Sequence, residues 1–149
     1  MIVFVPSASL PRPLLEGDLH LLAKTIDHGV RTKGVQCVGL RFVSEKEIMR
    51  LNKIYRGKNH PTDVLSFGSI PVPLPKSASV EQGLGDVIIC SVYALREAKR
   101  RMIPPREEYF RLIVHGVLHL LGYDHTNLED ELKMFQIQEA CVEKVFSCV

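Results

Sequence analysis

Residues 115–125 bring three of the six histidines of the chain close together. The stretch reads His115-Gly116-Val117-Leu118-His119-Leu120-Leu121-Gly122-Tyr123-Asp124-His125. Residues four apart lie one turn apart on the same face of a helix, so His115 and His119 can bind one ion. Gly122 allows the chain to leave the helix, because glycine adopts the left-handed conformation at little cost, and the turn can return His125 as a third ligand. Three neutral imidazoles with one open position are typical of a catalytic zinc site.

The apolar residues around the histidines predict which side of this helix meets the core. At about 100° per residue, an arc of about 140° contains six apolar residues: Phe110, Ile113, Val114, Val117, Leu118 and Leu121. His115 and His119 fall outside this arc, so the core-facing stripe is complete without them. The two histidines are therefore available to a ligand.

The spacing of the three histidines and of Gly122 also matches the metzincin protease pattern HExxHxxGxxH. Gly116 stands where that pattern has its general-base glutamate, and glycine has no side chain that could take up a proton. The sequence thus predicts a zincin-like metal helix and argues against proteolysis.

Two further segments join the histidine motif in pointing to one family. The first runs from NKIYRGK (52–58) into PTDVLSF (61–67), and the second is LGDVII (84–89). With the string HGVLHLLGYDH, they resemble the YbeY family of metal-dependent endoribonucleases. The resemblance extends from about residue 35 to the end of the last predicted helix.

The resemblance implies an enzyme, a single-strand-specific endoribonuclease that acts in ribosomal RNA processing and ribosome quality control. Maturation of the 3′ end of small-subunit ribosomal RNA belongs to that role. It also implies one zinc ion per chain, held by His115, His119 and His125, and a functional arginine, Arg56, beside the metal. Other divalent transition metals suit neutral imidazole as well. Single-stranded RNA, precursor ribosomal RNA and the ribosome or its proteins are the implied partners.

The chemistry of phosphodiester cleavage agrees with a role for Arg56. Negative charge develops on the non-bridging oxygens, and a guanidinium can bind two of them at once. Asp63 and Asp86 also match family positions, and we interpret them as structural or supporting residues. No glutamate or further histidine near the motif is an obvious general base, so metal hydroxide and the 2′-hydroxyl of the RNA both stay open as the nucleophile.

Two clusters of basic residues favour a polyanion as the ligand. One leads toward Arg56 and consists of Lys46, Arg50, Lys53, Arg56 and Lys58. The other consists of Arg96, Lys99, Arg100, Arg101 and Arg106. No aromatic residues alternate with these cations, so the pattern predicts no base specificity. We interpret the remaining histidines as incidental: His20, His28 and His60.

Two alternatives stay open at the level of the sequence. In one, the chain is a ribosome-assembly factor without catalytic activity, and its zinc is structural. A fourth protein ligand would favour this alternative; Asp124 or a cysteine could supply it, although neither has supporting spacing. The other alternative is a zincin-type metallopeptidase, which cleavage of peptides that stops on chelation would support.

Length and composition predict a single domain over residues 1–149. The chain is 46% hydrophobic and carries a formal net charge of +2, so overall charge does not indicate a nucleic-acid binder. It has neither a basic signal-peptide start nor an apolar run of the roughly 18 residues that a membrane span needs. We therefore expect a cytoplasmic protein without membrane contact. The four cysteines form no CxxC pair and predict no disulfide: Cys37, Cys90, Cys141 and Cys148.

Hydrophobic periodicity predicts an α+β fold, a mixed sheet of about four strands with helices packed on it. Strands are expected at residues 2–5, 35–43, 63–70 and 85–90, and a Pro- and Ser-rich surface loop at 71–83. Helices are expected at 14–28, 45–56, 91–102, 106–122 and 128–146. Ser44-Glu45-Lys46-Glu47 reads as a capping box that begins the second helix, and Gly57 follows its end.

Overall fold

The structure is a computed structural model that describes residues 1–68, 82–124 and 126–147. In these ranges the chain forms, in order, β1 (Ile2–Pro6), α1 (Glu16–Val30), β2 (Gln36–Val43), α2 (Glu45–Arg56), β3 (Val64–Gly68), β4 (Gln82–Cys90), α3 (Ser91–Arg101), α4 (Pro105–Leu120) and α5 (Leu128–Ser147). The order of strands and helices agrees with the order expected from the sequence.

The four strands form one mixed sheet in the order β1-β2-β4-β3. β1 and β2 run parallel, as do β2 and β4, and each of these parallel pairs is separated in sequence by helical segments. β3 pairs antiparallel with β4 and forms one edge of the sheet. The predicted α+β class with a mixed sheet of four strands is confirmed.

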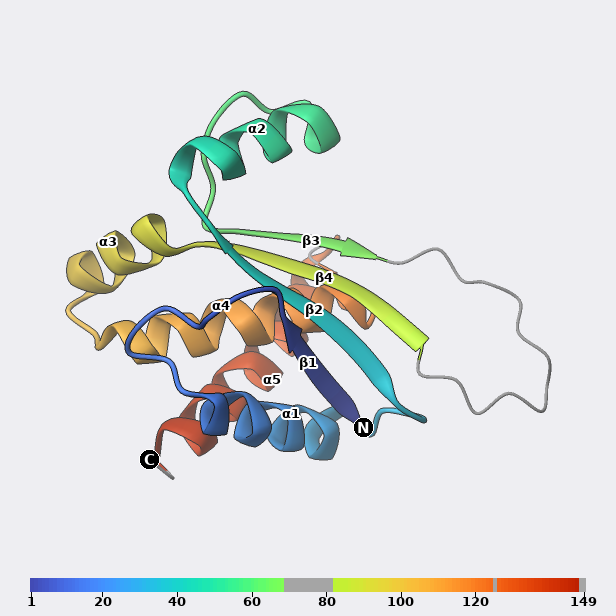
Figure 1. The fold of residues 1–149 in the computed structure, drawn as a ribbon. Helices are drawn as coiled ribbons and strands as arrows, with labels where there is room; N and C mark the ends of the chain where they lie inside the picture. Colours follow the sequence, from blue (N-terminus) through green and yellow to red (C-terminus); the bar gives the residue numbers. More distant parts are fainter. Residues whose placement is uncertain (69–81, 125, 148–149) are drawn as a thin grey trace.

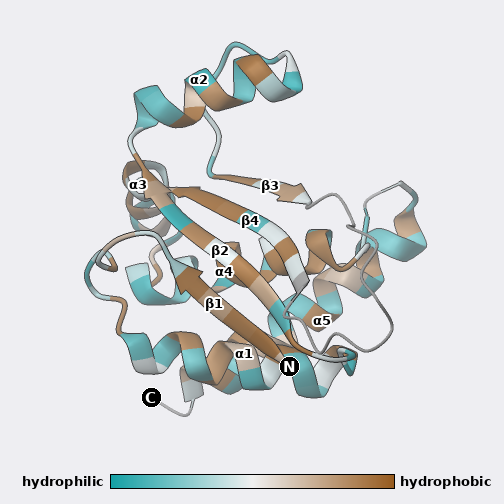
Figure 2. Cartoon of the chain, turned by 45° about the vertical axis from the view of Figure 1, so that its right-hand side comes forward, coloured by the Kyte–Doolittle hydropathy of each residue, from teal (hydrophilic) through white to brown (hydrophobic). Residues whose placement is uncertain are grey.

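The two faces of the sheet pack against different helices. α1, α4 and α5 gather on one side of the sheet, and α2 lies on the other side (Figure 1). The larger core lies under α1, α4 and α5, whereas Ile48 and Leu51 of α2 pack with Leu65, Ile88 and Cys90 in a smaller cluster. In Figure 2, β1 is coloured hydrophobic, and the helices mix hydrophobic and hydrophilic residues along their length.

α4 is buried more widely than its apolar arc predicts. Five members of the arc are fully buried: Phe110, Ile113, Val114, Val117 and Leu118. Leu121 is only partly buried, and Tyr109, Leu112 and Gly116 are buried as well. The reason is that α4 touches the sheet, α3 and α5 at once, so contacts surround most of its circumference.

The predicted start of the last strand was wrong. β4 begins at Gln82, where the sequence predicted the end of a loop, because Gln82 and Gly83 pair with Gln36 and Cys37 of β2. Gln82 and Gly83 carry no strand signal of their own, so neighbouring β2 decides their conformation. The strand expected at 63–70 is described only as Val64–Gly68, and residues 69–81, with most of the expected loop, lie outside the described residues.

The predicted ends of α2 are confirmed in most respects. The Ser44 hydroxyl accepts a hydrogen bond from the Glu47 backbone N–H at 3.1 Å, and Gly57 ends the helix with φ of 68°. The carboxylate of Glu47, which a full capping box would turn back toward Ser44, instead pairs with Arg50. The competing ion pair therefore replaces half of the predicted box.

The free edge of β1 has little capacity for further pairing. The Ile2 backbone N–H donates to both carboxylate oxygens of Asp27 on α1, at 3.0 and 2.8 Å. Pro6, the last residue of the strand, has no N–H.

Among the described residues, no helix combines the length and the apolar character that crossing a membrane requires.

Candidate active site

The last two turns of α4 carry His115 and His119 on the same side of the helix. Pro105 occupies the first turn, where its missing N–H costs nothing, and Gly122 adopts φ of 100° directly after the helix. Both histidines are half-buried, and their ring centroids lie 4.6 Å apart. Their Nε2 atoms lie 3.1 Å apart, so the Nε2 atoms of both rings point toward the same position.

The distance between the Nε2 atoms of the two histidines suits a metal ion bound to both. Two nitrogens bound tetrahedrally to zinc at about 2.0–2.1 Å lie about 3.3 Å from each other. The observed 3.1 Å between the Nε2 atoms of His115 and His119 is close to that separation. His125, the predicted third ligand, lies outside the described residues, and among those described no three His, Cys, Asp or Glu side chains gather as a metal group.

A cleft of about 550 Å³ opens beside the two histidines. Its walls come from the end of α2, the segment that follows it, β3, the end of α4 and the turn after α4. The polar residues that line it are Asn52, Arg56, Lys58, His60, Thr62, Ser66, His115, His119, Tyr123 and Asp124. His60, which the sequence left without a role, is one of them, and its interpretation as incidental stays a prediction.

Arg56 reaches the cleft from the last turn of α2. Its Nη2 donates to the Ser66 carbonyl of β3 at 2.7 Å, and its guanidinium lies 5.5 Å from the centre of the Phe67 ring. The Ser66 hydroxyl in turn donates to the Gly116 carbonyl of α4 at 3.3 Å. Ser66 therefore connects the arginine with the helix that carries both histidines. The fold brings Arg56, His115 and His119 to one cleft although about 60 residues separate them in sequence.

Gly116 lies where α4 packs tightly against β4 of the sheet. A Cβ atom at this position would meet Cγ1 and Cγ2 of Val87 on β4 at 2.7 and 2.9 Å. The glutamate of the protease pattern would not fit here unless α4 or Val87 moved. The replacement noted in the sequence therefore has a packing reason as well as a chemical consequence.

Asn52 shapes the rim of the cleft and was missed by sequence reasoning. Its side chain is almost fully buried, its Nδ2 donates to the His60 carbonyl at 2.9 Å, and its backbone carbonyl accepts from Lys58 N–H at 3.2 Å. Both bonds hold the segment after α2 against the helix. A signal existed, because Asn52 stands four residues after Ile48 and so lies on the apolar face of α2.

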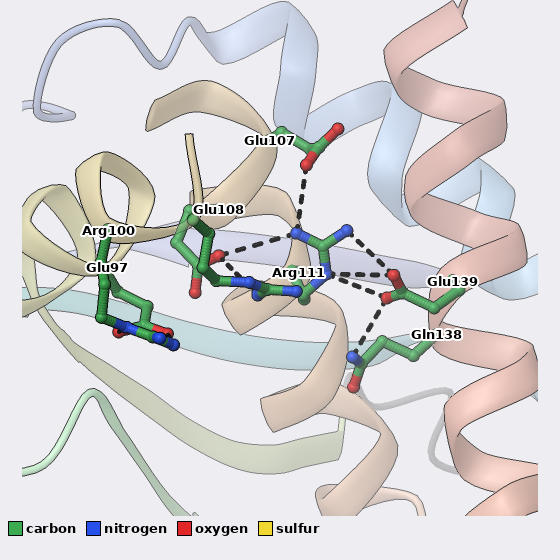
Figure 3. Close-up of polar contacts among 8 residues, drawn as sticks. Glu97, Arg100, Glu107, Glu108, Arg111, Gln138 and Glu139 are labelled. Carbon is green, nitrogen blue, oxygen red and sulfur yellow. Dashed lines mark hydrogen bonds and ion pairs between the residues drawn. The ribbon is translucent and has the colours of Figure 1, made fainter. Parts of the chain in front are cut away.

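Gln138 of α5 is a second residue that the sequence did not single out. Its Oε1 lies 2.8 Å from Nδ1 of His115, and it is 7% exposed. Its Nε2 donates to Glu139, which Arg111 of α4 binds with two nitrogens (Figure 3). Burial alone would raise the pKa of Glu139, but hydrogen bonds from Arg111 and Gln138 outweigh it and lower that pKa. An isolated glutamine within a helix pattern carries no sequence signal for such a contact.

Asp63 and Asp86 lie outside the cleft lining. Asp63 caps the start of β3, because its Oδ1 accepts from Val64 N–H at 2.8 Å. Asp86 lies on β4 beside Gly39 of β2, where a Cβ would overlap its carboxylate. Their interpretation as structural or supporting residues stays a prediction.

The second basic cluster is largely neutralised, contrary to the polyanion interpretation. Each of its four arginines pairs with an acid: Arg96 with Glu45, Arg100 with Glu97, Arg101 with Glu108 and Arg106 with Asp18. In the first cluster, Arg56 and Lys58 line the cleft, whereas Arg50 pairs with Glu47. Only spatial contacts distinguish paired cations from cations that face a cleft.

A family described as "Endoribonuclease YbeY" matches residues 15–145 of this chain. The chain belongs to this endoribonuclease family. The protein of that name from Halalkalibacterium halodurans is 42% identical over 125 residues, 80% of this chain and 79% of the relative. That from Persephonella marina is 40% identical over 111 residues, 74% and 71% of the two chains. That from Bdellovibrio bacteriovorus is 34% identical over 147 residues, 96% and 92% of the two chains.

A solved structure has a similar fold over nearly the whole chain. The solution structure of a Thermotoga maritima protein covers 99% of this chain and 90% of its own, with a TM-score of 0.64 and 29% identity. The resemblance stated from the sequence is confirmed, and so are the endoribonuclease activity and the RNA-hydrolysing enzyme class that it implied. The metal ligands and the role of Arg56 stay predictions.

Proposed function

We propose that the chain is a metal-dependent endoribonuclease that cuts single-stranded RNA in the cleft between α2, β3 and α4. In this proposal His115, His119 and His125 hold one zinc ion, and Arg56 binds the phosphate that is cut. The observation that carries the proposal is the convergence of Arg56, His115 and His119 on one cleft.

The chain's own residues have defined tasks in this proposal. The Nε2 atoms of His115 and His119 bind the metal, and the guanidinium of Arg56 binds non-bridging phosphate oxygens as their charge grows. Lys58 adds a second cation at the same rim, which favours a phosphate over a neutral ligand. When bound, zinc supplies Lewis-acid chemistry at a phosphoryl oxygen. Imidazole ligands also accept other divalent transition metals.

The biological context follows from the family resemblance and belongs to the same proposal. The RNA is a precursor of ribosomal RNA, and processing of the 3′ end of small-subunit RNA is the reaction. The ribosome or its proteins are the partners, and the cytoplasm is the location. Membership in an endoribonuclease family supports this enzyme over an assembly factor with a structural zinc. The tight contact of Gly116 with Val87 argues against the peptidase alternative.

The proposal is tested by cleavage of a single-stranded RNA by the purified, zinc-loaded protein. Arg56→Ala is expected to lower the cleavage rate by about 10²–10³-fold, the usual cost of removing one charge-stabilising donor. His115→Ala is expected to abolish both cleavage and stoichiometric zinc. Arg100→Gln is the matched control, because Arg100 lies on α3 and pairs with Glu97. Equal cleavage by all four proteins would point to a contaminating nuclease and would contradict the proposal.

A further inference from the structure

The contact between Gln138 and His115 joins two helices at the proposed metal site. Gln138 lies on α5 and His115 on α4, 23 residues apart, and Oε1 of the amide is 2.8 Å from Nδ1 of the ring. The side chain of Gln138 is almost entirely buried. Apolar residues of α5, among them Met134, Val142 and Val145, already pack into the core. Helix packing alone therefore does not require a polar residue at position 138.

The orientation of the Gln138 amide follows from its second neighbour. Its Nε2 lies 3.3 Å from a carboxylate oxygen of Glu139. An ionised carboxylate accepts hydrogen bonds and cannot donate, so the amide nitrogen must face Glu139 and the amide oxygen must face His115.

Arg111 keeps the Glu139 carboxylate in place and ionised. Its Nε lies 3.0 Å from Oε2 of Glu139 and its Nη2 lies 2.9 Å from Oε1, a bidentate pair (Figure 3). Arg111 is itself held by Glu107 at 3.3 Å and by buried Glu108 at 3.6 Å. The lowered pKa of Glu139 agrees with a carboxylate that stays ionised at neutral pH.

The amide orientation determines which nitrogen of His115 carries the proton. A carbonyl oxygen only accepts, so Nδ1 of His115 must donate. A neutral imidazole has one N–H, and Nε2 is therefore left with its lone pair. That lone pair points to the side of the cleft where Nε2 of His119 lies 3.1 Å away.

We propose that Gln138 is a positioning residue, which fixes His115 in the Nδ1–H tautomer and so presents an unprotonated Nε2 to the cleft. Glu139 and Arg111 complete this arrangement, because they prevent the side-chain amide of Gln138 from rotating by 180°. The inference rests on the proposed function in one respect, that Nε2 of His115 is the atom that binds the metal. Partners of this kind raise the affinity of a histidine for its metal by orienting the ring.

The decisive measurement is the tautomer of His115 in the metal-free protein, read from the imidazole ¹⁵N shifts at a pH where the ring is neutral. The wild-type protein is expected to show the Nδ1–H form. Gln138→Met removes the acceptor while keeping the length of the side chain, and it should yield mainly the Nε2–H form. Gln136→Met is the matched control, because Gln136 is exposed on the same helix and should leave the tautomer unchanged.

Two further variants separate positioning from a merely structural role. Gln138→Glu keeps an acceptor oxygen beside Nδ1 and should restore the Nδ1–H form. Glu139→Gln removes the charge that orients the amide and should give a mixture of both tautomers, even if Gln138→Met fails to fold. Zinc affinity, measured by titration calorimetry, should fall by about 10–100-fold in Gln138→Met and recover in Gln138→Glu.

The outcomes distinguish the inference from the function on which it rests. A His115 that keeps the Nδ1–H form in both Gln138→Met and Glu139→Gln would overturn the positioning role, whatever the protein cleaves. Expected tautomers and zinc affinities in a protein that leaves single-stranded RNA intact would uphold the positioning role and contradict the proposed nuclease.

Discussion

At the scale of single residues, Gly116 sets the distance between α4 and the sheet. Its missing side chain leaves room for both methyl groups of Val87, and its carbonyl accepts the hydroxyl of Ser66. The sequence showed only that glycine cannot act as a general base. Contact with a strand almost 30 residues earlier was beyond any local pattern, because β4 reaches α4 only in the folded chain.

Gly116→Ala is expected to destabilise the protein despite the better helix propensity of alanine. The gain in propensity is about 1 kcal/mol, whereas forcing a methyl group into a packed core costs about 1–3 kcal/mol. Val87 cannot yield easily, because a β-branched side chain has few rotamers. Urea unfolding gives the free energy, and Val87→Ala in the same chain should relieve the loss.

Gly17→Ala is the matched control for that prediction. Gly17 lies in α1, and no heavy atom within 4 Å would meet its Cβ, so alanine should leave stability unchanged or raise it slightly. A Gly116→Ala protein as stable as the Gly17→Ala protein would show that α4 can move away from Val87 at no cost.

At the scale of elements, α2 and the segment after it build one wall of the cleft. Ser44 caps the start of the helix, Gly57 ends it, and Asn52 binds the segment back through the carbonyl of His60. Ser44 and Gly57 affect the stability of α2. Asn52 alone of these three lines the cleft.

Asn52→Ala and Ser44→Ala should therefore differ in their effect on RNA cleavage. Ser44→Ala removes an N-cap and should cost about 1 kcal/mol of stability with no change in cleavage rate. Asn52→Ala removes the side-chain bond to the His60 carbonyl, which costs about 1 kcal/mol, and it loosens the rim at His60, although the backbone bond from Lys58 N–H to the carbonyl of residue 52 remains. We expect its kcat/KM to fall about tenfold at a temperature where both variants are folded. Equal kcat/KM values in the two variants would contradict the expectation that Asn52 shapes the cleft whereas Ser44 only stabilises the helix.

The elements that the sequence predicted well carry their own signals. The period of α4, the exit at Gly122 and the turn at Gly57 each depend on a few neighbouring residues, and each is observed. β4 was predicted too short because Gln82 and Gly83 become a strand through their partners in β2.

For the candidate site, the sequence motif supplied the histidines, and the resemblance supplied Arg56. Asn52 and His60 also line the cleft; the place of Asn52 on the apolar face of α2 was a signal for its burial, whereas no spacing indicates His60. His125 stays a prediction, since it lies outside the described residues.

At the scale of the whole molecule, the positive charges are distributed unevenly between paired and cleft-facing positions. The arginines of α3 and of the start of α4 are matched by acids, while Arg56 and Lys58 face the cleft. Ion pairs already formed within the protein release few counterions when RNA binds.

The salt dependence of RNA binding should reveal this difference. Lys58→Gln is expected to weaken binding of single-stranded RNA and to lower the slope of log K against log salt by about one. Arg100→Gln should leave the slope unchanged, because Arg100 is paired with Glu97. Fluorescence anisotropy at several salt concentrations measures both slopes. A slope lowered equally by Arg100→Gln would restore the second cluster as an RNA contact.

Two glutamates beside Arg111 should give the stability of the whole fold opposite dependences on pH. The folded pKa of Glu139 lies below its ordinary value of 4.5, so its contribution is present above pH 4.5 and is lost as the pH falls through the folded pKa. Burial raises the folded pKa of Glu108 despite Arg101 and Arg111, so its contribution is present below pH 4.5 and is lost as the pH rises through the folded pKa.

Thermal unfolding of Glu139→Gln and Glu108→Gln across pH tests these signs. The stability advantage of the wild type over Glu139→Gln should shrink as the solution becomes acidic below pH 4.5. Its advantage over Glu108→Gln should shrink as the pH rises above 4.5. Parallel curves for both variants would show that neither pKa shift is coupled to folding.

The free edge of β1 has a consequence for the behaviour of the protein in concentrated solution. An exposed strand edge is a template on which other chains can add strands and form aggregates. Asp27 already occupies the Ile2 N–H, and Pro6 offers none, so an incoming strand would find an interrupted row of donors. At the other edge, Arg56 covers the Ser66 carbonyl of β3. These contacts lower the tendency of both edges of the described sheet to add strands, while the cleft between α2, β3 and α4 stays open to a ligand.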